Sequence, residues 1–261
     1  MKILLSFLIV LCLAFVSCVK SMANEDDPGV NNFVIHSRNL GESAKELLSD
    51  RDYRSLTIEI QYMSGFAPQD ETVSNLKKFM QTFLRKPGGI SVSLKEIDTI
   101  EKKSLTVNDV ISIENNSRTQ FAKKSNHTIF VLFTNGFHAD NRILGMAYRN
   151  TSAVLFGKAI QINSNVEGKL TRAELETAVL LHEMGHLLGL GNKSSDPHKD
   201  HLDKKHGNHC ANPKCLMFYS TETKKLSVVL RKGNVPELDA DCRRDLLKNG
   251  GRNSELSFPH H

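Results

Sequence analysis

Tryptophan is absent from this chain of 261 residues, and aromatic residues make up only 7% of it. Lys and Arg outnumber Asp and Glu by 34 to 29, yet the basic residues are scattered among the acidic ones. A nucleic-acid-binding surface needs a basic stripe with interleaved aromatic residues, so no nucleic-acid partner is expected. Internal repeats and Pro-rich or Ser-rich linkers are missing as well, which favours one globular domain.

Long apolar runs are missing except near the amino terminus. The apolar run from Ile3 to Val16 is shorter than the ~20 residues of a membrane-spanning helix and is typical of an export signal. It can end in a lipoprotein-type box at Cys18, which would attach the chain to a membrane through a lipid, or at Ser21-Met22-Ala23, which would release it. We therefore expect residues 1–23 to be a signal peptide and the protein to be exported, either secreted or periplasmic, or lipid-anchored.

Cysteine is scarce outside that leader. Cys12 and Cys18 lie within it, which leaves Cys210, Cys215 and Cys242. An odd number of cysteines does not make a pure disulfide framework in an exported protein. Either one disulfide leaves a free thiol, or the three sulfurs act together on a metal.

Hydrophobic periodicity predicts alternating strands and helices between a flexible segment at residues 24–53 and a tail at residues 251–261. The domain between them, residues 54–250, has the following predicted elements: strands at 56–62, 90–97, 128–134, 143–148 and 152–162, and helices at 73–84, 106–124, from 171 to about 188, and 236–248.

The helix that begins at Thr171 carries the sequence His182-Glu183-Met184-Gly185-His186. Histidines four residues apart lie on the same face of a helix, so both imidazoles can bind one ion. The neighbouring Glu183 can accept a proton from metal-bound water. Zinc is the ion favoured by neutral imidazoles with an open fourth position. The pattern therefore predicts a zinc site.

With Gly189 the motif extends to HExxHxxG, which resembles the metzincin family of zinc peptidases. Metzincins place a third ligand three residues after this glycine, where this chain has Asn192, a poor zinc ligand. The later sequence His209-Cys210-Ala211-Asn212-Pro213-Lys214-Cys215-Leu216-Met217 resembles the archaemetzincin signature of His-Cys, four residues and Cys-x-Met. The resemblance implies that residues 192–208 are an insertion and that His209 is the third ligand.

Three further histidines lie in that insertion: His198, His201 and His206. Each is an alternative third ligand, and together they could bind a separate metal. A solvated polar loop would have the same composition.

The resemblance implies further roles. Met217 would be the Met-turn residue beneath the zinc ligands, and Tyr219 would contact the zinc or the reaction oxyanion. The sequence Leu238-Asp239-Ala240-Asp241-Cys242-Arg243-Arg244 is similar to the family's Cys-x-x-Cys-Arg-Arg ending, with Asp239 in place of the first cysteine. A second, structural zinc would then be held by Cys210, Cys215, Asp239 and Cys242. The alternative is a Cys210–Cys215 disulfide with Cys242 free.

The resemblance also implies the fold class, an α/β (α+β) metzincin-like catalytic domain. It has a mixed, mostly parallel sheet with an antiparallel edge strand, an active-site helix, a Met-turn and a C-terminal helix. Strand 143–148 is the candidate edge, along which a peptide substrate could pair.

The expected function is hydrolysis of peptide bonds by a zinc-activated water, with Glu183 as general base. Two alternatives remain open. One is an exported metal-binding module with a structural zinc, and the other is a latent peptidase covered by residues 192–208. Nothing in the sequence indicates the oligomeric state.

Overall fold

The computed structural model describes residues 34–253 apart from 166, 168–169, 192–198, 227–232 and 234. Its elements follow one another in this order: α2 (Ala44–Leu48), β1 (Ser55–Met63), α3 (Asp70–Phe83), β2 (Ile90–Ile97), β3 (Ser104–Leu105), α4 (Val107–Ser117), β4 (Asn126–Phe133), β5 (Phe137–His138), β6 (Gly145–Arg149), β7 (Ser152–Leu155), α5 (Gly157–Asn163), α6 (Arg172–Leu187), η1 (Lys199–His201) and α8 (Ala240–Lys248).

The main sheet has five strands in the order β2-β1-β4-β7-β6. Every pairing is parallel except that of β6 with β7, which is antiparallel and places β6 at the edge. The mixed, mostly parallel sheet with an antiparallel edge strand is therefore confirmed. A second sheet of two short parallel strands joins β3 to β5.

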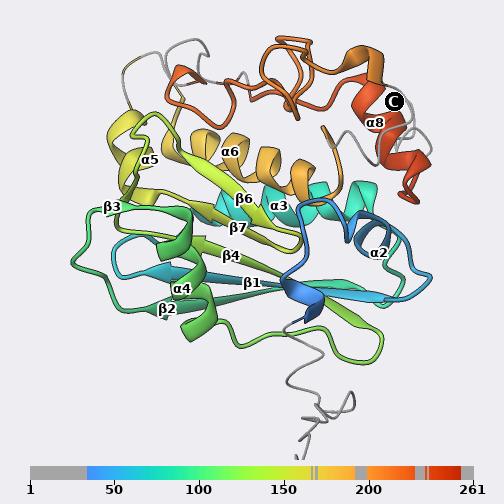
Figure 1. Cartoon of the computed structure of the whole chain (residues 1–261), viewed down its shortest axis with the longest axis horizontal. Coiled ribbons are helices and arrows are strands. Elements are labelled where there is room, and N and C mark those ends of the chain that lie inside the picture. The colour runs from blue at the N-terminus through green and yellow to red at the C-terminus, as the bar shows by residue number, and fades with distance from the viewer. Residues whose placement is uncertain are drawn as a thin grey trace, which may run out of the picture.

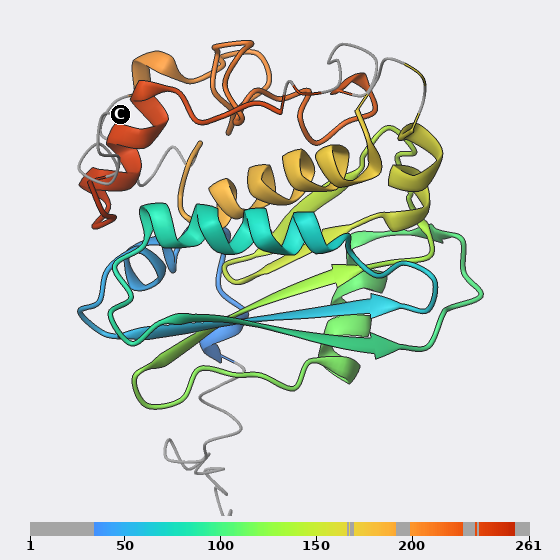
Figure 2. The ribbon, with the colours of Figure 1, turned by 180° about the vertical axis from the view of Figure 1, so that it is seen from behind.

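Helices α3 and α6 lie side by side on one face of the main sheet, and α4 lies on the other face (Figures 1 and 2). The alternation along β1 explains the two layers. Ile58 and Ile60 are fully buried apolar residues, whereas Glu59 and Gln61, which alternate with them, bond to the chain at and just after the end of α4. Successive strand residues point to opposite faces of a sheet.

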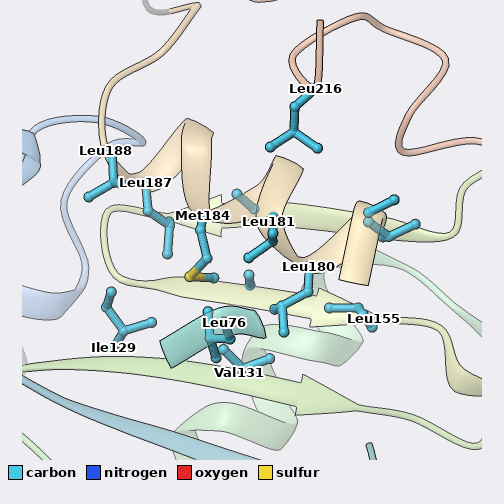
Figure 3. Packing of buried hydrophobic residues seen from close by; sticks show 14 of the residues in the cluster. Leu76, Ile129, Val131, Leu155, Leu180, Leu181, Met184, Leu187, Leu188 and Leu216 are labelled. Atoms are coloured by element: carbon cyan, nitrogen blue, oxygen red, sulfur yellow. The ribbon is translucent and has the colours of Figure 1, made fainter. Parts of the chain in front are cut away.

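The apolar core lies between α6, α3 and the strands. Figure 3 shows Leu180, Met184 and Leu187 pointing from α6 toward the sheet, where Ile129 and Val131 lie on β4. All five side chains are fully buried. Full burial of such a side chain stabilises the fold by roughly 1.5–3 kcal/mol, so this cluster holds α6 firmly in place.

Two predicted elements differ from the structure. The apolar stretch 152–162 is not one strand, because β7 ends at Leu155 and helix α5 begins at Gly157. Its second half buries Phe156, Ala159 and Ile160 while Ile162 stays 59% exposed, which is helical spacing. Because both halves of this stretch are apolar, the sequence does not show that the spacing of buried residues changes from that of a strand to that of a helix.

The last helix begins at Ala240 and not near residue 236, because the Asp239 side chain accepts a hydrogen bond from Cys242 N–H as its N-cap. The helix expected over 106–124 ends at Ser117. Beyond it, the N–H groups of Thr119 and Gln120 turn toward the Glu59 carboxylate.

The expectation of a flexible segment over residues 24–53 is wrong for the part that the structure describes. Helix α2 lies in it, and Leu47 and Leu48 are fully buried in the main core. His36 is also buried and accepts a hydrogen bond from Ala122 N–H. Because most of this segment is polar, the sequence did not indicate that two of its leucines pack into the core like those of the long helices.

The predicted leader, with Cys12 and Cys18, lies outside the described residues, as does most of the tail at 251–261. Among the helices that the structure does describe, none is long and apolar enough to cross a membrane.

Candidate metal centre

Helix α6 positions the first part of the site. Thr171 accepts a hydrogen bond from Glu174 N–H, and the Glu174 carboxylate accepts one from Thr171 N–H, which closes the predicted capping box. From Leu175 to Leu187 every side chain of the helix is buried. His182 and His186 are therefore held one turn apart on a helix that is covered on all sides.

The His182 and His186 imidazoles face each other, with their Nε2 atoms 3.1 Å apart. The Nδ1 atom of His182 lies 2.7 Å from Leu216 O, and that of His186 lies 3.3 Å from Leu190 O. A carbonyl oxygen only accepts, so these contacts assign the proton of each neutral ring to Nδ1. Both Nε2 lone pairs then point into the same space, which is the arrangement of two imidazoles that share a cation.

His209 completes the group. Its ring lies 5.3 Å from that of His182 and 5.1 Å from that of His186, and its Nδ1 atom is 2.6 Å from Gly207 O. Its Nε2 atom is buried and has no hydrogen-bond partner. Such an orphaned buried acceptor is costly unless an ion binds it. The residues therefore fit a metal ion.

Two glycines bring the chain to this position. Gly189 and Gly191 end the helix with φ angles of 87° and 76°, which favour glycine. A Cβ atom at Gly191 would overlap the Asn208 carbonyl, so the returning chain passes directly over this glycine. The glycines that end α6 therefore also allow the close approach of the chain that places His209 beside the helix.

The rival histidines have other partners. His201 Nε2 lies 2.7 Å from the Asp245 carboxylate, and His206 Nδ1 lies 2.6 Å from that of Asp203. His198 lies outside the described residues. Among the alternatives in the described part of the chain, only His209 joins His182 and His186.

Burial keeps all three imidazoles neutral. It lowers the pKa of His182 well below its ordinary value and lowers that of His186 to about 3, with the neighbouring imidazoles as the second cause. The pKa of His209 is lowered by burial as well. The neutral imidazole is the form that binds a metal.

Glu183 lies fully buried beside this group. Its Oε2 atom accepts a hydrogen bond of 2.6 Å from Ala147 N–H on the edge strand, while its Oε1 atom is buried without a partner. A Cβ atom at Gly145 would overlap Val179 and lie 3.1 Å from Glu183 Oε1, so this glycine makes room for the carboxylate. Burial raises the pKa of Glu183 well above its usual range, and the nearby Glu222 adds to the rise.

Glu222 was not anticipated from the sequence. Its carboxylate oxygens lie 3.6 Å from His209 Nε2 and 4.0 Å from His182 Nε2, and its ligand atom and those of the three histidines lie within 4.8 Å of one another. Burial raises its pKa to about 7. No spacing rule marks this residue. It reaches the site because Leu144 N–H donates to Glu222 O, a contact between segments far apart in the sequence.

Met217 and Tyr219 lie on the segment that passes over α6. Met217 is buried, and a Cβ atom at Gly185 would overlap its sulfur, so it packs directly against the metal-binding turn of the helix as a Met-turn residue would. Tyr219 stacks on His206, with ring centroids 3.6 Å apart and an interplanar angle of 10°. Its predicted contact with zinc or an oxyanion stays a prediction.

Comparisons with known proteins find the same fold. The archaemetzincin of Methanopyrus kandleri superposes with a TM-score of 0.51 over 75% of this chain and 96% of that one, at 16% sequence identity. The fold is archaemetzincin-like. Metalloproteinase-II of Bacteroides fragilis also matches, with a TM-score of 0.44 and 16% identity over 77% of this chain and 54% of that one. No family model and no curated protein matches the sequence.

The archaemetzincin-like fold brings together a second group, formed by Cys210, Cys215, Asp239 and Cys242. The three cysteines are free thiols in the structure, so the alternative Cys210–Cys215 disulfide is not present. Cys215 Sγ lies 3.6 Å from Cys242 Sγ, and Cys210 Sγ lies 3.2 Å from the Asp239 carboxylate. Because His209 and Cys210 are consecutive, this second group directly adjoins the first.

Backbone N–H groups point at the sulfurs of this second group. Met217 and Asp239 each donate to Cys215 Sγ at 3.4 Å, and Asn212 donates to Cys210 Sγ at the same distance. Hydrogen bonding from Cys210, followed by that from Cys242, lowers the pKa of Cys215 to about 4, while the hydrogen bonds among the three sulfurs raise the pKa of Cys210 and that of Cys242. The donors to Cys215 favour its thiolate, the form in which cysteine binds zinc.

Proposed function

We propose that this chain is a zinc-dependent peptidase whose metal is held by His182, His186 and His209. The observation that carries the proposal is the convergence of three buried Nε2 atoms whose Nδ1 partners are all backbone carbonyls. Three imidazoles with a fourth position left for chemistry are typical of catalytic zinc. The archaemetzincin-like fold supports this proposal.

The role of Glu183 follows from its position on α6, next to His182 and against the edge strand. A zinc ion in this site supplies Lewis-acid chemistry when bound, by polarising a peptide carbonyl and acidifying water. Glu183 takes a proton from the attacking water through its free Oε1 atom and delivers it to the leaving amine. The hydrogen bond from Ala147 N–H holds the other oxygen and so orients the carboxylate.

Peptides or proteins are the proposed substrates. Strand β6 is the last strand of the sheet, and Glu183 bonds to it at Ala147. An extended peptide that adds a strand along Gly145–Arg149 would lie next to this carboxylate. The edge strand therefore offers a binding edge and also holds the general base on α6 in place through the Ala147 N–H group.

A metal-binding module with a structural zinc is the first alternative. Glu183 argues against it, because a buried carboxylate with one oxygen free is costly and a structural site has no use for it. The latent peptidase remains as a second alternative, because His206 of the insertion stacks on Tyr219 and its carbonyl oxygen lies 3.2 Å from His209 Nδ1.

The decisive experiment is Glu183→Gln, which keeps the shape and the Ala147 contact but removes the base. Peptide hydrolysis should fall by roughly 10²–10⁴-fold, while the bound zinc measured by elemental analysis stays the same. The control is Glu71→Gln, which removes an exposed carboxylate from α3 and should leave hydrolysis unchanged. Full activity of the Glu183 variant would reject the mechanism.

We further propose a second, structural zinc at Cys210, Cys215, Asp239 and Cys242, in keeping with the N–H donors around the sulfurs. Export of the protein, freely or with a lipid on Cys18, is also proposed, on the apolar leader alone. Mass spectrometry of the mature protein would show whether its first residue is Cys18 with a lipid or follows Ala23.

A further inference from the structure

Glu222 is a half-buried carboxylate in the same space as the three imidazoles. It lies beyond the HExxHxxG and Cys-x-Met motifs, and the proposed hydrolysis does not use it. Its oxygens approach two different imidazoles, His182 at 4.0 Å and His209 at 3.6 Å. It is thus the only acidic residue of the described chain that groups with these histidines as a metal ligand would.

The distances fit a four-cornered site. Bonds of ~2.0–2.1 Å to a tetrahedral zinc place neighbouring ligand atoms about 3.3 Å apart. The Nε2 atoms of His182 and His186 are 3.1 Å apart, and the Glu222 oxygens are 3.6 Å from His209 Nε2 and 4.0 Å from His182 Nε2, slightly longer than bound ligands would be. The carboxylate therefore lies close to the fourth corner, where a catalytic site admits its substrate.

The backbone around Glu222 is fixed, in contrast to its carboxylate. Leu144 N–H donates to Glu222 O at 2.8 Å, and Lys224 N–H donates to Arg142 O at 2.9 Å, so residues 222–224 pair antiparallel with residues 142–144. Among the residues that the structure describes, none donates a hydrogen bond to the Glu222 carboxylate. The side chain can therefore leave the site by rotation while its backbone stays in place.

This pairing adjoins the edge on which a peptide would add. Residues 142–144 lead directly into β6, whose residues Gly145–Arg149 form that edge. A peptide extended past Gly145 meets Glu222 at the end of the edge. Arrival of a substrate and displacement of the carboxylate are therefore linked in space.

We propose that Glu222 is a removable fourth ligand of the metal at His182, His186 and His209. This inference rests on the proposed metal site. Glu222 closes the metal to solvent while no peptide is bound, and an arriving peptide displaces it. The resting protein is a slow enzyme, because each turnover begins with release of this carboxylate.

Cobalt(II) loaded into the full chain in place of zinc gives a readout that does not depend on activity. In the wild type we expect a visible spectrum that stays constant between pH 6 and pH 8, because the fourth position is a carboxylate. In Glu222→Gln a solvent molecule takes that position, and the spectrum should titrate near pH ~7. Zinc affinity should fall at least tenfold, and peptide hydrolysis at saturating zinc should rise several-fold.

Glu71→Gln removes an exposed carboxylate and should reproduce the wild-type spectrum, affinity and rate. Glu222→Asp guards against misfolding, because its shorter carboxylate should give a zinc affinity between those of the wild type and Glu222→Gln. Superimposable spectra of wild type and Glu222→Gln would overturn the proposal. A lower rate in Glu222→Gln that affects only peptides with a free amino terminus, and not acetylated ones, would overturn it too, by assigning Glu222 to the substrate ammonium group.

The two proposals fail differently. If no variant hydrolyses peptides but the cobalt spectra differ as expected, the ligand role of Glu222 stands and the peptidase function falls. If Glu183→Gln abolishes hydrolysis and the spectra do not differ, the peptidase function stands and Glu222 is not a ligand.

Discussion

At the residue scale, the metal centre depends on how each imidazole is oriented. Three carbonyl oxygens, from Leu216, Leu190 and Gly207, fix the Nδ1 protons and so direct the Nε2 atoms at one another. Partners of this kind tune metal ligands as strongly as the choice of ligand does. All three carbonyls belong to residues that follow α6, so the site forms only when these segments have packed.

His209 and His206 provide a matched pair of variants. His209→Ala should lower zinc affinity at least about 100-fold, because losing a ligand costs more than the 10–100-fold loss of an outer partner. His206→Ala removes an equal side chain three residues earlier, which bonds to Asp203 and stacks on Tyr219. It should leave zinc affinity within about twofold in a competition titration with a chromogenic chelator. The reverse order of the two affinities would move the third ligand into the insertion.

The residues of the motif were predictable because helical spacing alone brings His182, Glu183 and His186 together. His209 was predictable only through its register with Cys210, Cys215 and Met217. Glu222 was not, because no local spacing brings it to the site, and its place depends on the pairing of residues 222–224 with residues 142–144. A local pattern carries no information about such a contact.

At the element scale, α8 begins where the second group of metal ligands is completed. Asp239 has two roles there, because one oxygen caps the helix at Cys242 N–H and the other lies 3.2 Å from Cys210 Sγ. A carboxylate in place of a cysteine therefore also stabilises the start of the helix. This gives a physical reason why the chain tolerates Asp239 in a cluster that otherwise consists of sulfur.

Asp239→Asn separates the two roles, since Asn caps a helix as well as Asp but is a poor zinc ligand. Without metal, the free energy of unfolding should change by less than about 0.5 kcal/mol. With zinc, the variant should gain less thermal stability than the wild type, as measured by Tm with and without a chelator. Of the two variants Asp239→Asn and Asp239→Cys, the second should show the larger zinc-dependent rise in Tm. Equal gains in wild type and Asp239→Asn would exclude this carboxylate from the metal.

The order of strands and long helices was predictable from periodicity, because α3 and α6 each bury a long apolar set. The shorter elements were not. Helix α2 has only five residues, too few to show a period, and α5 continues an apolar stretch begun by β7. Packing against the core decides the conformation of segments this short.

At the scale of the whole molecule, the segment before β1 is part of the folded unit. The His36 ring is within hydrogen-bond distance of Arg118 and Thr151, and burial, with Arg118 as the second cause, lowers the pKa of His36 to about 2. An unfolded histidine has a pKa near 6.5. Below that pH, His36 is protonated in the unfolded chain but stays neutral in the folded chain.

The stability from a neutral His36 is thus complete above pH 6.5 and is lost as the pH falls toward about 2. The loss approaches about 1.4 kcal/mol per pH unit. His36→Gln cannot titrate, so its free energy of unfolding should fall less steeply between pH 6.5 and pH 4.5. Urea unfolding of both proteins at several pH values measures the two slopes, and the other histidines contribute equally to each. Parallel slopes would show that His36 takes up its proton in the folded state.

The adjacency of His209 and Cys210 has a further consequence. One peptide bond joins a ligand of the first metal group to a ligand of the second, and Cys210 N–H is anchored to Met217 O at 2.8 Å. Filling of the cysteine group would fix the backbone from which the His209 ring projects and so raise the affinity of the histidine group for its ion. Because such coupling is reciprocal, the two ions would bind cooperatively, and a chelator that extracts the thiolate-bound ion would weaken metal binding in the histidine group as well.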